Sequence, residues 1–87
     1  MTKPHVHASH PAVIARLKRA AGHLRAVIGM IEEGRPCPEV AQQLLAVEKA
    51  VANAKRALIH DHMDHCLDDE DHSPSDRDEL KAIARYL

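Results

Sequence analysis

The chain has 87 residues, a formal net charge of −1, eight histidines, two cysteines and a single aromatic residue, which is a tyrosine. A chain of this length forms one small domain with a thin core, and such domains often gain stability by association. Its aliphatic composition favours closely packed helices over a sheet. No apolar run approaches the roughly 20 residues that span a membrane, and no signal-peptide pattern opens the sequence, so we expect a cytoplasmic protein without a membrane partner.

The charges are unevenly distributed along the chain. Residues 1–35 carry six basic and two acidic side chains, a balance of +4, whereas residues 36–72 carry three basic and eight acidic ones, a balance of −5. On a nearly neutral chain, a basic first part predicts that one face of the protein binds a polyanion. The histidines are also clustered, because seven of the eight lie in residues 5–10 or 60–72.

Three helices are predicted in chain order. Residues 1–9 are expected to form a flexible histidine-containing arm, and residues 10–87 a single helical domain. From Val13 to Ile31, apolar residues recur at alternating spacings of four and three, which predicts an amphipathic helix over residues 10–33. Gly34 is placed to end this helix.

A second helix is predicted over residues 38–67, where the same spacing recurs without an internal proline or glycine. The short connection makes the first two helices an antiparallel hairpin. A third helix is predicted from Ser75 to the end of the chain, with Ser75 and Asp78 as a capping pair. The predicted fold is therefore all-α.

The two cysteines lie at opposite ends of the second helix. His62 and Cys66 are four residues apart, so they share a helical face in a spacing that chelates transition metals. Cys37 lies about 37 Å of helix away from His62, and one straight helix therefore cannot bring both to one ion. Two antiparallel copies can, and a two-fold axis then creates two equivalent sites. A further ligand is expected from the histidines at positions 5, 7 and 10. The first helix runs antiparallel to the second and is long enough to bring its first residues level with His62.

No hydrolytic constellation of nucleophile, base and orienting acid is present, so the sequence predicts neither an enzyme nor a small organic substrate. Basic residues on the two long helices are predicted to contact DNA phosphates with salt-dependent affinity. They are Arg16, Lys18, Arg19, Arg25, Lys49, Lys55 and Arg56. No helix-turn-helix signature accompanies them.

Over residues 10–87 the chain resembles the CsoR/RcnR/FrmR family of bacterial repressors, whose members sense copper, nickel or cobalt, and formaldehyde. The resemblance rests on short segments and on the spacing Cys–x24–His–x3–Cys. The segments are Arg16-Leu17-Lys18-Arg19, Gly22-His23-Leu24-Arg25, Cys37, Gln42-Gln43-Leu44, Ala46-Val47, His62 and Cys66.

The resemblance implies a three-helix protomer that dimerises around the second helix into a four-helix bundle and assembles as a dimer of dimers. It implies operator double-stranded DNA as the partner, released when an inducer binds. It also implies a metal site made of Cys37 from one chain with His62 and Cys66 from the other, and an N-terminal ligand at His5. Copper sensors often have a tyrosine before the first cysteine, where this chain has Pro36.

The identity of the metal depends on the fourth ligand. Two thiolates and one imidazole suit Cu(I), whereas the addition of His5 gives a four-coordinate site that suits Ni(II), Co(II) or Zn(II). The histidine-rich arm favours the nickel/cobalt branch. We therefore predict a repressor that binds operator DNA without metal and releases it on binding Ni(II) or Co(II), derepressing an efflux gene. A Cu(I) sensor, a formaldehyde sensor and, from a different class, a cytosolic metal-storage protein are the alternatives.

Overall fold

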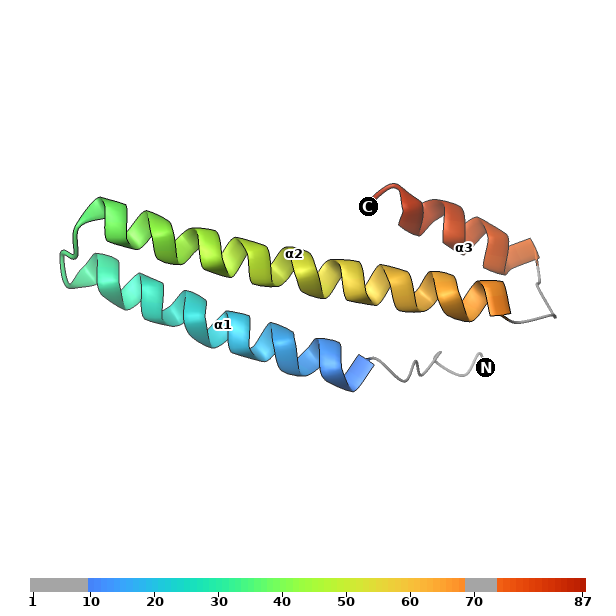
Figure 1. Ribbon diagram of the computed structural model, residues 1–87, viewed down its shortest axis with the longest axis horizontal. Coiled ribbons are helices and arrows are strands. Elements are labelled where there is room, and N and C mark those ends of the chain that lie inside the picture. Colours follow the sequence, from blue (N-terminus) through green and yellow to red (C-terminus); the bar gives the residue numbers. More distant parts are fainter. Residues whose placement is uncertain (1–9, 69–73) are drawn as a thin grey trace.

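The protein, here a computed structural model, contains α1 (His10–Glu32), α2 (Cys37–Asp68) and α3 (Pro74–Ala84) in that order. The structure describes the backbone of residues 10–68 and 74–87 and the side chains of residues 10–64 and 77–87, so the predicted arm lies outside it. No strand occurs in these ranges, and the all-α prediction is confirmed. α1 and α2 lie side by side and antiparallel, and α3 folds back beside the C-terminal part of α2 (Figure 1).

Gly34 builds the turn between α1 and α2. Its φ of 77° lies in the left-handed region that glycine adopts without steric cost. The Arg35 amide donates to the Met30 carbonyl at 3.0 Å, and the Gly34 amide donates to the Ile31 carbonyl at 3.1 Å. This pair of bonds is a Schellman motif, which satisfies carbonyls at the end of α1. The tight turn produces the predicted antiparallel hairpin.

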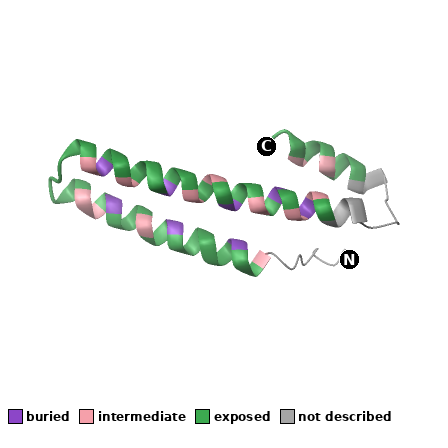
Figure 2. Cartoon of the chain, viewed as in Figure 1, coloured by how far each residue is buried: buried purple, intermediate pink, exposed green. Residues whose placement is uncertain are grey.

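The core lies along the facing sides of α1 and α2, whereas their outer sides are exposed (Figure 2). Only half of the apolar repeat is buried, and its members are spaced by seven residues. They are Val13, Ala20 and Val27 on α1 and Val40, Val47 and Ala54 on α2. We call the other half the outer apolar layer, which is 41–58% exposed. It consists of Leu17, Leu24 and Ile31 on α1 and Leu44, Val51 and Leu58 on α2. A hairpin of two helices buries only one apolar layer between them, so the outer apolar layer can be buried only by further helices.

The helix ends differ slightly from the prediction. The first two helices agree within one residue at each end. The third helix was predicted to reach the end of the chain, but it ends at Ala84. There the Tyr86 amide donates to the Ile83 carbonyl at 2.9 Å, which is the tighter i to i+3 pattern of a turn. No helix among the described residues has the length and apolar character that crossing a membrane requires.

Candidate metal site and nucleic-acid surface

His62 is the only polar side chain that is buried in the described part of the chain, with 7% of its surface exposed. Its Nε2 lies 3.7 Å from Glu79 Oε1 on α3. A carboxylate beside one ring nitrogen fixes the orientation of a histidine and is a common partner of metal-binding imidazoles. Sequence reasoning missed Glu79, because its place beside His62 depends on how α3 folds back.

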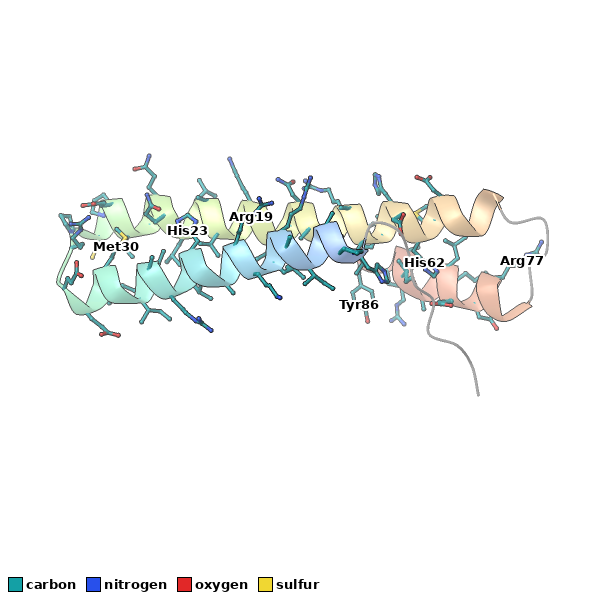
Figure 3. The ribbon with its side chains drawn as sticks, turned by 90° about the horizontal axis from the view of Figure 1, so that it is seen from below. Arg19, His23, Met30, His62, Arg77 and Tyr86 are labelled. Atoms are coloured by element: carbon teal, nitrogen blue, oxygen red, sulfur yellow. The ribbon has the colours of Figure 1, made fainter. Side chains whose placement is uncertain are left out.

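His62 lines a cavity of about 580 Å³, where the start of α1, the C-terminal half of α2 and α3 meet. It is lined by His10, Lys55, Leu58, Ile59, His62, Glu79, Ile83 and Tyr86. His62 and Tyr86 lie close together at this end of the molecule (Figure 3). The structure therefore brings His10 to the cavity that contains His62. It also places Lys55, which was predicted to contact DNA, at this cavity.

Cys37 lies at the opposite end of α2 and is exposed. It lines an apolar hollow of about 470 Å³ with Ile31, Val40 and Leu44. Because α2 is one continuous helix, Cys37 and His62 are roughly 37 Å apart along it. Among the described side chains of one chain, no three histidine, cysteine or carboxylate groups lie close enough to hold a metal ion. One chain therefore presents two separate parts of the predicted site.

Two predicted ligands fall outside the described side chains. Cys66 lies in the last turns of α2, where the structure describes the backbone alone. His5 belongs to residues 1–9 and lies outside the described residues altogether. The roles of both residues therefore stay predictions.

The predicted DNA-binding residues fall on different sides of the hairpin. Arg16 and Arg19 share a hollow of about 280 Å³ between α1 and α2 with His23, Ala20, Ala50 and Asn53. Arg19 and His23 project from the same side of α1 (Figure 3). At about 100° per residue, Lys18 and Arg25 lie on the roughly opposite side of α1.

Two side-chain hydrogen bonds border this hollow. His23 Nε2 donates to Gln43 Oε1 at 2.6 Å and connects α1 with α2. Arg56 Nη1 donates to Asn53 Oδ1 at 2.9 Å. Lys49 lies on the Asn53 side of α2 by the same helical geometry. Arg16 and Arg19 thus line one hollow, and Arg56 is bonded to Asn53 at its rim, so the hollow has the charge and the hydrogen-bond donors of a nucleic-acid surface.

Comparison with known proteins identifies the class and then the family. The chain shares its fold with a solved regulator, the nickel-responsive transcriptional regulator InrS, with a TM-score of 0.79 and 36% identity, covering 98% of this chain and 100% of that one. This similarity defines the class as small all-α transcriptional regulators. A family model described as a metal-sensitive transcriptional repressor matches residues 9–86. The chain belongs to this family of repressors, and the resemblance noted in the sequence is confirmed.

Curated relatives carry names for copper sensing. The copper-sensing transcriptional repressor CsoR of Mycobacterium ulcerans is 40% identical over 56 residues, which cover 64% of this chain and 48% of the relative. CsoR of Bacillus subtilis is 39% identical over 54 residues, which cover 62% of this chain and 54% of the relative. The chain thus spans about half the length of the curated relatives it matches. Similar proteins are named for two different metals.

Proposed function

We propose that the chain is a metal-responsive transcriptional repressor in which two copies build two shared metal sites. The metal-free protein binds operator DNA in the cytoplasm, and metal binding releases the DNA. The observation that carries this proposal is the separation of Cys37 from His62 along one continuous α2. A second copy lying antiparallel brings the partner's thiol to this imidazole.

The outer apolar layer supports association of the two copies. Its leucines, such as Leu44 at 41% exposed, remain on the surface of a single chain although they continue the core repeat. Burial of apolar surface contributes roughly 25 cal/mol per Å². A second hairpin that covers this layer completes a four-helix bundle, and a dimer of such dimers is the proposed tetramer.

The donor set fits a transition metal. The Cys37 thiol is accessible, and the buried His62 imidazole has Glu79 beside its Nε2, so both groups suit a soft or borderline ion. Cys37 of one chain, with His62 and Cys66 of the other, would hold the ion, and His5 would add a fourth donor. With His5 the site suits Ni(II) or Co(II), the metals we favour. The copper-sensing relatives support Cu(I) as the second candidate.

Linkage supplies the mechanism. A ligand shifts an equilibrium only by its differential affinity for the two states, and the coupling between two ligands is reciprocal. Metal ligation across the dimer favours one arrangement of the two α2 helices, and DNA favours the other. DNA therefore lowers metal affinity by the same factor by which metal lowers DNA affinity.

Fluorescence anisotropy of a labelled duplex tests the proposal, with the duplex selected from a random-sequence pool by the metal-free protein. Ni(II), Co(II), Cu(I) and Zn(II) are titrated separately into the complex. Release by at least one metal, at about one ion per chain, is expected. Several ions per chain without DNA binding would instead indicate a storage protein, and release by formaldehyde alone would indicate an aldehyde sensor.

A further inference from the structure

We propose that the hollow lined by Arg16, Arg19, His23 and Asn53 seats one backbone phosphate of duplex DNA. We call it the phosphate seat, and it rests on the proposed function, because it assigns the DNA contact to particular side chains. The hollow has a volume of about 280 Å³. The side chains that line it between the two helices include the small Ala20 and Ala50, which leave room for a phosphate group.

The chemistry of the lining matches a phosphodiester. Arg16 and Arg19 are one helical turn apart on α1, so their two guanidinium groups border the same hollow. A guanidinium donates two parallel hydrogen bonds to phosphate oxygens, which a lysine ammonium cannot do with the same geometry. The seat therefore provides positive charge together with directed donors.

Two hydrogen bonds hold the uncharged part of the seat in place. His23 donates from Nε2 to Gln43 Oε1 at 2.6 Å, and this bond fixes the imidazole between the two helices. Asn53 accepts from Arg56 at 2.9 Å through its carbonyl oxygen. Its amide NH₂ group is then oriented as a donor at the rim. His23 and Gln43 act as positioning residues, whereas Asn53 donates to the phosphate.

The phosphate seat lies on a different side of α1 from the outer apolar layer. Arg16 precedes Leu17, and His23 precedes Leu24, so each pair is separated by about 100° around the helix. A second copy that covers the leucines leaves the seat open to DNA. By contrast, Lys18 and Arg25 lie on the far side of α1 from the hollow, although they carry the same charge.

The seat is divided between two helices, and this division connects it with metal sensing. Arg16, Arg19 and His23 belong to α1, whereas Asn53 belongs to α2, the helix that also carries Cys37 and His62. A displacement of α2 relative to α1 therefore changes the distance between donors that must converge on one phosphate. The seat converts a rearrangement of α2 into a loss of DNA affinity.

Anisotropy titrations of the metal-free full chain test the seat, with the duplex that the wild-type protein selects from a random pool. Asn53→Ala removes no charge, and we expect about ten-fold weaker binding with an unchanged salt dependence, because a hydrogen bond to a charged group is lost. Arg16→Ala should weaken binding further and reduce the slope of log K against log salt by about one. Arg77→Ala is the control, with the same charge change on α3 away from the seat, and binding should weaken less than about three-fold.

An Asn53→Ala protein that binds within about two-fold of wild type would overturn the seat, as would equal losses for Arg16→Ala and Arg77→Ala. A wild-type protein that selects no duplex would overturn the proposed function instead. Sodium phosphate is compared with sodium chloride at equal ionic strength. Because a seat for a phosphodiester also accepts inorganic phosphate, phosphate should displace the duplex more strongly than chloride, and this difference should disappear in Asn53→Ala. A difference that persists in Asn53→Ala would overturn the seat.

Unfolding is excluded as a cause by comparing two variants of His23. His23→Gln keeps a side-chain donor for Gln43 and should retain most of the DNA affinity. His23→Leu removes the donor and should lose about as much affinity as Asn53→Ala, with thermal unfolding monitored for each variant. Equal DNA affinity for the two His23 variants would contradict the positioning role.

Discussion

The two ends of α2 place the predicted metal ligands in opposite surroundings. Cys37 begins the helix after a tight turn and is exposed beside an apolar hollow. His62, near the other end, is buried under α3, faces Glu79 and shares a cavity with residues from all three helices. One end presents an exposed thiol beside an apolar hollow, and the other presents a buried imidazole beside a carboxylate. Among the described side chains, neither end brings together three donor groups that could hold a metal ion, which supports the proposed site shared between chains.

Removal of the exposed donor should have the largest effect. Cys37→Ala should lower metal affinity by more than about 100-fold, because it removes a ligand itself. Residues that only hydrogen-bond to a ligand contribute about 10- to 100-fold. Because the side chain is exposed, the helical circular dichroism should be unchanged. Competition with a chromophoric chelator measures the affinity. A variant that binds metal as tightly as wild type would show that the exposed end is not part of the site.

The next prediction breaks the proposed contact between chains. Leu44→Asp puts a carboxylate in the outer apolar layer, where a leucine is half-exposed in one chain and buried in the proposed dimer. Loss of such a leucine costs about 2–5 kcal/mol, so the protein should become monomeric in sedimentation velocity. Gln42→Asp adds the same charge on the roughly opposite side of α2 and should leave the assembly intact. Equal effects of the two variants would contradict the dimer face.

A smaller effect is expected at the His62 end of α2. Glu79→Gln removes the carboxylate that lies 3.7 Å from His62 Nε2. Partners of metal-binding histidines contribute about 10- to 100-fold in affinity, and we expect a loss near the lower limit because Glu79 is half-exposed. Asp78→Asn makes the same charge change one residue away, and its metal affinity should stay at the wild-type value. Matching losses in both variants would assign the effect to net charge alone.

The smallest effect concerns the outer side of α1. A Cβ added at Gly22 meets no atom within 4 Å in one chain. Gly22→Ala should therefore raise the free energy of unfolding by about 1 kcal/mol, as measured by urea denaturation. A destabilised Gly22→Ala protein would instead indicate that another copy packs closely on this side of the helix.

The local parts of the structure could be predicted from the sequence. The apolar spacing located the two long helices, and Gly34 located the turn between them, because both depend on near neighbours. The pairing of His62 with Glu79 could not be predicted, since it depends on how α3 returns to α2. The basic residues were predicted as one set. Lys18 and Arg25, however, lie away from the hollow that Arg16 and Arg19 line, and Lys55 lies near His62. Residue type indicated their charge, and only the helical geometry separated their surfaces.

Mixing two inactive variants tests the central claim, that each metal site is shared between chains. Cys37→Ala lacks the thiol in both sites of its dimer, and His62→Ala lacks the imidazole in both. After unfolding and refolding together, a mixed dimer contains one intact site, formed by Cys37 of one chain and His62 of the other. The account predicts that tight metal binding, absent from each variant alone, returns at about one ion per mixed dimer. If the mixture binds metal no better than the separate variants, the shared site is contradicted.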